Sequence, residues 1–146
     1  MKRKQAKIYY QMGNSLLKNG NLPSAINSYK DAIRLDPNFF RAFCNLGVAL
    51  KNVGFLKEAE DIFEKALSIK PYSAVIYNNL GNVYTSMGNH EYAKRCYRRA
   101  INIYPRYKAA YYNYGQLLYV LGETAKGLEM LTIRAKLEKD ELRSKN

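Results

Sequence analysis

Glycine recurs in this chain at an interval of 34 residues without a slip, and this period constrains the fold more than any other feature. Alanines, aromatic residues and prolines return at the same step. The glycines form two series, Gly13, Gly47, Gly81 and Gly115, then Gly20, Gly54, Gly88 and Gly122, and the prolines are Pro37, Pro71 and Pro105. A unit of this length cannot bury its own hydrophobic surface, so the copies are expected to stack on one another as a repeat protein.

One copy, residues 74–105, indicates what each repeat contains. Apolar residues in its first half follow the spacing of a helix with one buried face. Gly88 then suits a left-handed residue that ends this helix, and Asn89 suits the cap of the next one. A second apolar pattern continues until Pro105, which cannot extend a helix. The pattern predicts a helical hairpin, and its repetition predicts an all-α fold.

The repeat resembles the tetratricopeptide-repeat family. The family pattern has an aromatic at position 4, Leu-Gly at 7 and 8, Ala at 20, an aromatic at 24, Ala at 27 and Pro at 32. Counted from residue 74, these positions hold Tyr77, Leu80, Gly81, Ala93, Tyr97, Ala100 and Pro105. The resemblance implies a right-handed α-solenoid of antiparallel helix pairs, with three full repeats and a degenerate capping repeat.

The period also divides the chain. The expected repeats of the tetratricopeptide-repeat domain, residues 6–141, are residues 6–39, 40–73, 74–107 and 108–141. Residues 1–5 are expected to form a frayed basic N-terminal arm, because nothing in the sequence caps or packs them. Residues 142–146 remain as a C-terminal tail.

The last repeat departs from the pattern, with Arg134 in place of a small residue and Lys139 in place of the proline. In the family a following helix packs over that small residue, so Arg134 predicts a terminal, capping hairpin. With no proline to stop it, the last helix is expected to run towards Arg143 along an apolar stripe that includes Leu128 and Leu142. The N-terminal end has no such cap, which leaves self-association through that end as an alternative.

Composition and the cysteine positions indicate the cellular compartment of the protein. The longest apolar run, residues 117–121, is too short to span a membrane, and the first residues lack the apolar core of a signal peptide. Cys44 and Cys96 occupy different repeat positions, so reduced thiols are expected, as in an intracellular protein. We therefore predict a cytoplasmic location, with the basic segment MKRK leaving a nuclear one open.

The side chains that catalysis needs are missing from the sequence, so we predict a protein that is not an enzyme. His90 is the only histidine, and it falls in a turn between helices. No cluster of His, Cys, Asp or Glu has the spacing of metal ligands. The glycines are 7 and 34 residues apart, which is not the spacing of a phosphate-binding loop. We expect no metal and no cofactor.

Amide side chains recur on the first helix of each repeat, mainly at positions 6 and 9. The family resemblance implies that these helices line a concave groove. An amide offers both a donor and an acceptor, so such a column suits the backbone of an extended peptide. It is similar to the asparagine ladder in the repeat domain of O-linked N-acetylglucosamine transferase. The predicted peptide-binding amides are Gln11, Asn14, Asn45, Asn79, Asn82, Asn113 and Gln116. The alternative is that these amides bond only between neighbouring helices or to water.

Other residues of the groove are expected to set its specificity. The first half of the groove is basic, and the second half is polar and aromatic. The residues concerned are Lys7, Tyr10, Arg41 and Lys51 in the first half, and Asn78, Tyr112 and Tyr119 in the second. A segment that is acidic at one end and apolar or aromatic at the other suits this pattern. We predict a non-catalytic adaptor or scaffold that binds an extended segment of a partner protein, with an acidic partner as one option.

Chaperone-binding members of the family hold a C-terminal carboxylate between three cations and two asparagines. At the corresponding positions, Asn14 and Asn45 are present in this chain. Tyr10, Val75 and Asn79 stand where the cations would be. Without those charges the sequence argues against a carboxylate clamp.

The alternative function is binding of nucleic acid or another polyanion. A net charge of +12 and a dense basic strip in the third repeat favour it. The strip is Lys94, Arg95, Arg98, Arg99, Arg106 and Lys108. It is expected on the convex side with Tyr97 turned into the core, so stacking aromatics are expected to be largely absent. A solvated surface accounts for the strip equally well.

Overall fold

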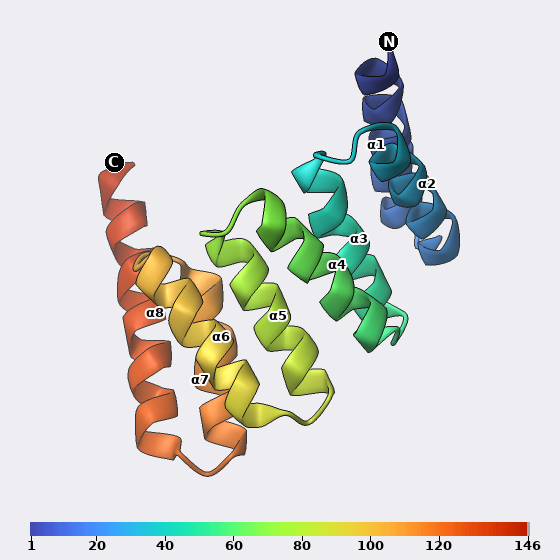
Figure 1. Cartoon of the computed structure of the whole chain (residues 1–146). Helices are drawn as coiled ribbons and strands as arrows, with labels where there is room; N and C mark the ends of the chain where they lie inside the picture. Colours follow the sequence, from blue (N-terminus) through green and yellow to red (C-terminus); the bar gives the residue numbers. More distant parts are fainter. Residues whose placement is uncertain (146) are drawn as a thin grey trace. The chain divides into compact units, whose positions relative to one another are not determined.

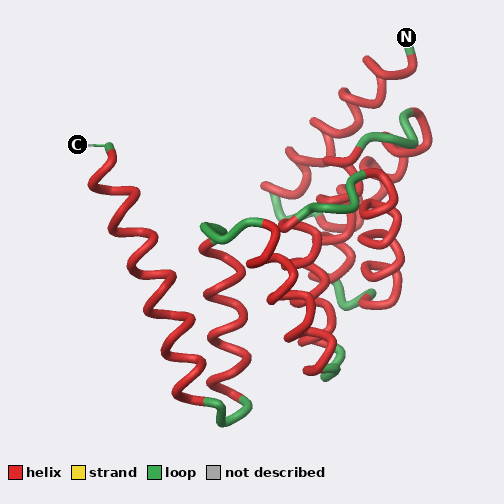
Figure 2. The backbone as a smooth tube through the Cα atoms, turned by 60° about the vertical axis from the view of Figure 1, so that its left-hand side comes forward, coloured by secondary structure: helices red, strands yellow, loops and turns green. Residues whose placement is uncertain are grey.

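The computed structural model describes residues 1–145, which form eight α-helices joined by short loops (Figures 1 and 2). Asn146, part of the expected tail, lies outside the described residues. The helices are α1 (Lys2–Lys18), α2 (Leu22–Leu35), α3 (Phe40–Asn52), α4 (Leu56–Ile69), α5 (Ala74–Ser86), α6 (His90–Ile103), α7 (Lys108–Val120) and α8 (Thr124–Ser144). No strand occurs in this part of the chain (Figure 2). The predicted all-α fold of paired helices, a helical-repeat solenoid, is confirmed.

The helices group into two compact units, residues 1–71 with α1–α4 and residues 72–146 with α5–α8. Each helix packs most extensively on its partner in the same hairpin. In the first unit α2 also packs on α3, and in the second α7 packs on both α5 and α6. Within each unit, then, one hairpin covers the apolar surface of the next, as the repeat period requires.

The turns inside the hairpins end each first helix as predicted. Gly88 has φ +75°, the left-handed conformation, and the N–H of Asn89 donates to the carbonyl of Tyr84. Asn89 is the N-cap residue of α6, but its side chain makes no capping bond. At the equivalent turn Asn21 does cap, because its Oδ1 accepts from the N–H of Ser24 at 3.2 Å.

The hairpin helices approach each other where the first helix carries a glycine. A Cβ on Gly13 would lie 2.6 Å from Cε1 of Tyr29, closer than packed atoms can come. Gly81 leaves the same space for Tyr97. The largest fully buried side chains are Tyr29, Leu46, Leu50 and Phe63 in the first unit and Ile76, Val83, Tyr97 and Leu118 in the second.

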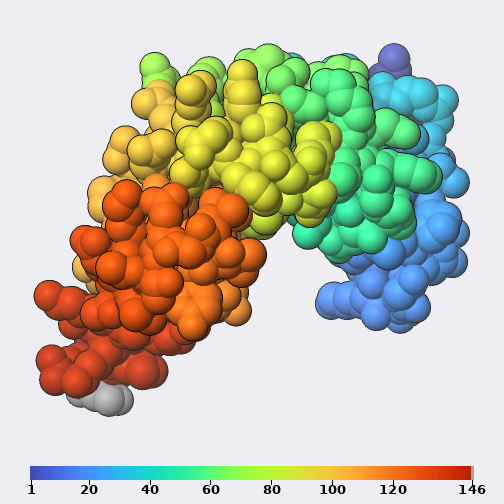
Figure 3. All heavy atoms as spheres, turned by 90° about the horizontal axis from the view of Figure 1, so that it is seen from below, coloured from blue at the N-terminus to red at the C-terminus, as the bar shows by residue number. Residues whose placement is uncertain are grey.

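The orange-to-red side chains of α7 and α8 form one continuous surface (Figure 3).

The two ends differ in part from the sequence predictions. Helix α1 begins at Lys2, so residues 2–5 extend the helix instead of forming a frayed arm, although their side chains are exposed. Helix α8 continues to Ser144 and extends past α7, as predicted (Figure 1). The predicted apolar stripe was wrong at Leu128 and Leu142, which are both exposed. No helix in the described chain is long and apolar enough to cross a membrane.

Candidate functional site

The asparagines at position 9 are bonded to tyrosine hydroxyls inside the hairpins. Tyr29 is fully buried and its Oη donates to Oδ1 of Asn14 at 2.9 Å. The Oη of Tyr97, also buried, donates to Oδ1 of Asn82 at 2.8 Å. A buried hydroxyl needs such a partner, because leaving it unpaired is costly. Asn14 and Asn82 therefore support the fold, which is the alternative left open by the sequence.

The second repeat shows that asparagine occurs at position 9 where position 24 is a tyrosine with a hydroxyl to bond. There the position-24 residue is Phe63, which has no hydroxyl, and position 9 is Val48. The pairing of Asn with Tyr in two repeats and of Val with Phe in another was readable from the sequence. Sequence reasoning missed this signal because it examined the column at position 9 by itself.

In the first unit the bonding continues from one hairpin to the next. Nδ2 of Asn45 on α3 donates to Oδ1 of Asn14 at 2.9 Å and to Oη of Tyr10 at 3.3 Å, both on α1. These bonds fix the orientation of both amides. Within the described residues, Nδ2 of Asn14 and Oδ1 of Asn45 have no protein partner, so one donor and one acceptor remain side by side.

In the second unit, Nδ2 of Asn113 on α7 donates to Oδ1 of Asn78 on α5 at 3.0 Å. This bond joins the same repeat positions as the bond from Asn45 to Tyr10. The expectation that Asn78 is exposed was wrong, because only 4% of its surface is accessible. Asn79, next to it, is half-buried and its side chain bonds to no other residue of the described chain. Asn79 is thus available to a ligand and Asn78 is not.

Cations gather around two adjoining hollows of the first unit. Lys7, Tyr10, Gln11, Phe39 and Arg41 line one of about 210 Å³. Arg3, Lys4, Lys7, Asp36, Asn38 and Phe39 line the other, of about 400 Å³. Lys51, half-buried at the end of α3, lines neither. Sequence reasoning missed Arg3 and Lys4 because it treated residues 1–5 as a frayed arm.

A mostly apolar hollow of about 300 Å³ lies in the second unit between α5, α6 and α7. Its lining includes the predicted residues Asn82, Tyr112, Asn113 and Gln116, together with Thr85, His90, Tyr97, Leu117 and Val120. Tyr119 is exposed but does not line it. Nδ1 of His90 is buried and has no hydrogen-bond partner among the described residues. The contributions of His90 and Val120 were not predicted.

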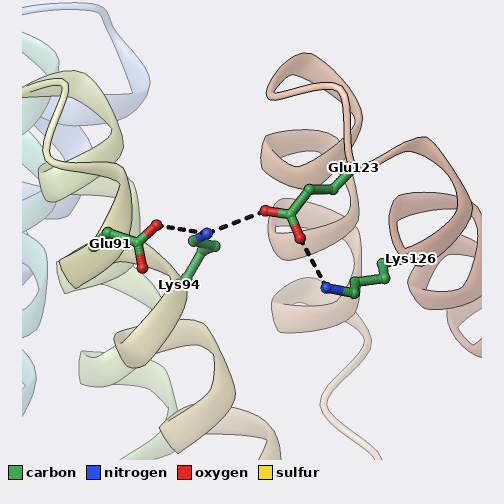
Figure 4. A network of polar contacts seen from close by, with 4 residues as sticks. All are labelled: Glu91, Lys94, Glu123 and Lys126. Carbon is green, nitrogen blue, oxygen red and sulfur yellow. Dashed lines mark hydrogen bonds and ion pairs between the residues drawn. The ribbon is translucent and has the colours of Figure 1, made fainter.

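The basic strip of the third repeat is divided by ion pairs (Figure 4). Nζ of Lys94 lies 2.6 Å from Glu91 and 3.1 Å from Glu123, and Glu123 also binds Lys126 at 3.1 Å. The Lys94 side chain is only 15% exposed. Lys108 pairs with Glu141 on α8 at 2.6 Å. Lys94 thus links two hairpins and Lys108 links the two helices of the last hairpin, whereas Arg95, Arg98, Arg99 and Arg106 remain exposed.

The thiols do not form a reactive site. Cys44 and Cys96 are both free cysteines, and burial raises the pKa of each thiol to about 11. Each therefore stays protonated, and poorly nucleophilic, at neutral pH. In the described part of the chain no three His, Cys, Asp or Glu side chains are grouped as metal ligands would be.

The chain is similar to several solved structures. It is 25% identical to MamA, covering 94% of this chain and 81% of that one with a TM-score of 0.82. It is 23% identical to the TPR domain of Arabidopsis OM64, covering 80% and 97% with a TM-score of 0.77. It is 21% identical to the first TPR of Spaghetti (RPAP3), solved bound to the HSP90 peptide SRMEEVD, covering 82% and 95% with a TM-score of 0.76.

Sequence comparison agrees with the structural likeness. No curated protein gives a significant match. A family model described as TPR repeat matches residues 13–54, and a second, described as tetratricopeptide repeat, matches residues 38–106. Both matched segments follow the 34-residue period and consist of the paired helices described above. The chain therefore belongs to the tetratricopeptide-repeat family.

Proposed function

We propose that this protein-interaction module holds an extended segment of a partner protein against the amides of its first helices. Each unit offers its own face, built from α1 and α3 in the first and from α5 and α7 in the second. The RPAP3 repeat domain, which has the same fold, is bound to a peptide in its solved structure, and this supports the proposal. The binding residues must nevertheless come from this chain's own side chains.

The observation that carries the proposal is how Asn14 and Asn45 are held. Bonds inside the first unit engage Oδ1 of Asn14 and Nδ2 of Asn45, and the opposite atoms remain for a ligand. An extended backbone presents N–H and C=O groups that match a fixed acceptor beside a fixed donor. Because the amides are already oriented, binding loses less conformational entropy at these side chains.

Charge supports an acidic segment at the first unit. Lys7 and Arg41 line the smaller hollow together with Tyr10, whose hydroxyl accepts from Asn45, and Arg3 and Lys4 line the larger one. Asp36 is the only carboxylate that lines either hollow. Carboxylates of the partner would therefore meet a net positive surface.

The second unit suits an apolar side chain. Its hollow is lined by Leu117, Val120 and the exposed ring of Tyr112, with the amides of Asn113 and Gln116 at hand for backbone bonds. A carboxylate clamp of the HSP90-binding kind is not part of the proposal, since Tyr10, Val75 and Asn79 replace its cations.

The test is selection from a phage-displayed library of random twelve-residue peptides, followed by fluorescence anisotropy with the enriched peptides. Gln11→Ala combined with Asn79→Ala removes two amides that make no internal side-chain bonds in the described chain. We expect binding to weaken about tenfold, the effect of losing one or two hydrogen bonds, with an unchanged melting temperature. Lys7→Glu with Arg41→Glu should select against acidic peptides.

Lys136→Ala with Lys139→Ala, exposed on α8, is the control for lost charge and should bind the peptides as the wild type does. Failure to enrich any peptide, or equal affinity of the wild type and the Gln11/Asn79 variant, contradicts the proposal.

A further inference from the structure

The outer face of α6 carries aromatic rings among its arginines. Tyr92, Arg95 and Arg99 are spaced three or four residues apart on the helix, Arg98 directly precedes Arg99, and all four are exposed. Tyr72, just before α5, is 76% exposed and lies beside them. We call these five residues the arginine–tyrosine face. Four of its residues lie on α6, whereas the amides lie on α5 and α7.

Two of the arginines lie over tyrosine rings. The Arg95 guanidinium carbon lies 5.3 Å from the ring centroid of Tyr92, and that of Arg99 lies 5.9 Å from the centroid of Tyr72. Tyr92 is 51% exposed, so about half of its surface is accessible, although its ring centroid also lies 5.5 Å from that of Tyr84. Tyr97 is buried as predicted, and the exposed rings of Tyr72 and Tyr92 lie beside the strip. Each pair places a positive charge over an aromatic ring.

The charge of this face is not neutralised within the second unit. Glu91 is the only acid in residues 74–107, and its carboxylate pairs with Lys94. Among residues 72–145, no carboxylate forms an ion pair with Arg95, Arg98 or Arg99. The ion pairs of Lys94 and Lys108 remove those two lysines from the candidate strip and leave four exposed arginines, three of which lie on α6 near the two exposed rings.

We propose that the arginine–tyrosine face binds single-stranded nucleic acid. Guanidinium groups bond phosphate oxygens through two parallel N–H donors, and exposed aromatic rings stack on unpaired bases of any sequence. A duplex offers phosphates but keeps its bases inside, and an acidic peptide offers carboxylates without regularly spaced planar groups. The combination of free arginines and exposed rings therefore matches a single strand best.

The experiment uses the full chain and fluorescein-labelled probes: a twelve-nucleotide oligo-U, the matching oligo-dT and a twelve-base-pair DNA duplex. Anisotropy is measured at 50 and 200 mM salt. We expect both single strands to bind more tightly than the duplex, with affinity falling as salt rises because phosphate contacts release counterions. Arg95→Ala with Arg98→Ala should weaken binding at least tenfold and reduce its salt dependence.

Two further variants separate stacking from bulk charge. Tyr72→Leu with Tyr92→Leu keeps the net charge and most of the packing, and it should weaken binding about tenfold by removing two stacking rings. Lys136→Ala with Lys139→Ala removes the same charge as the arginine pair, from exposed positions on α8 of the same unit, and should change affinity less than threefold. Thermal melts establish that each variant is folded.

The proposal is overturned if the wild type retains neither single strand at 50 mM salt, or if the duplex binds equally well. It is also overturned if the tyrosine variant binds as the wild type does, or if the α8 control loses as much as the arginine pair. Dimerisation that requires Arg95 and Arg98, in a protein that binds no single strand, would assign the face to a second copy instead. None of these readouts depends on peptide binding.

Discussion

Single residues in this protein show that one amide can have a folding role and remain available to a ligand. Asn14 satisfies the hydroxyl of Tyr29, whose ring fills the space that Gly13 leaves. Its Oδ1 also accepts from Asn45, so this residue connects α1 to both α2 and α3. A residue with these contacts cannot be assigned to binding by deletion alone, because its removal also disturbs the fold.

A double-mutant cycle at Asn14 and Tyr29 measures the folding role. Asn14→Val leaves the buried Tyr29 hydroxyl without its acceptor, and we expect a loss of about 1–3 kcal/mol in the free energy of unfolding. Tyr29→Phe in the same chain removes the unpaired hydroxyl and should recover part of that loss, since Val48 and Phe63 already coexist in the second repeat. Urea unfolding of the four proteins gives the coupling energy. Additive losses would show that the two side chains do not depend on each other.

Among the elements, α8 depends most on charge for its position. Only Gly127 of this helix is buried, and Leu128 and Leu142 are exposed. Glu123, at its N-cap, binds Lys94 of α6 (Figure 4). Glu141, near its other end, binds Lys108 of α7. A helix with so little buried surface gains proportionally more from such contacts with other helices, although each exposed pair contributes modestly.

The pH dependence of stability tests this role. Hydrogen bonds from Lys126 and Lys94 lower the pKa of the Glu123 carboxyl from its ordinary value of 4.5. Because the folded-state pKa is lowered, the stabilisation is fully present above pH 4.5 and is lost as pH falls through the folded-state pKa. We expect Glu123→Gln to lower the melting temperature at pH 7, and to have little effect at pH 2.

Calorimetry at low and high salt measures the difference in melting temperature between the wild type and Glu123→Gln at pH 7. This difference should shrink in 1 M salt because exposed ion pairs are screened. An equal effect of Glu123→Gln at both pH values would mean that the helix cap, and not the charge, is responsible.

At the scale of the whole molecule, stability is assembled from local contacts. Each unit holds its own set of fully buried side chains, and most contacts join helices that are adjacent in sequence. In such a repeat protein, damage to one hairpin is expected to spread mainly to its neighbours.

Hydrogen exchange after Phe63→Ala tests that expectation. Phe63 is fully buried against Gly47, and its truncation should cost about 3–5 kcal/mol. We expect amide exchange to accelerate most in α3 and α4 and least in α7 and α8, measured by mass spectrometry of the peptic peptides. Equal acceleration in all eight helices would indicate a single cooperative unit and contradict the prediction.

The helices and the core were predictable from the sequence because their signals are local and repeated. Gly88 ends α5 as its position suggested, and Tyr97 is buried at the aromatic position of the repeat. The amide face was predictable only in part. Asn78 occupies a column that was expected to be exposed, yet its neighbour Asn113 covers it from the next hairpin.

The sequence alone was sufficient for the period, the hairpins and the family, since each follows from spacing within 34 residues. Tertiary structure decided which polar side chains are used up in the fold. Lys94 meets Glu123 of the next hairpin at a separation of 29 residues, as Asn45 meets Asn14 at 31, and Lys108 meets Glu141 at 33 within the last hairpin. Such partners depend on how the helices pack on one another, and a pattern of residue types along the chain does not specify that packing. Arg95 and Arg98 remain on the surface for the same reason, because within residues 72–145 the packing brings no acid to them.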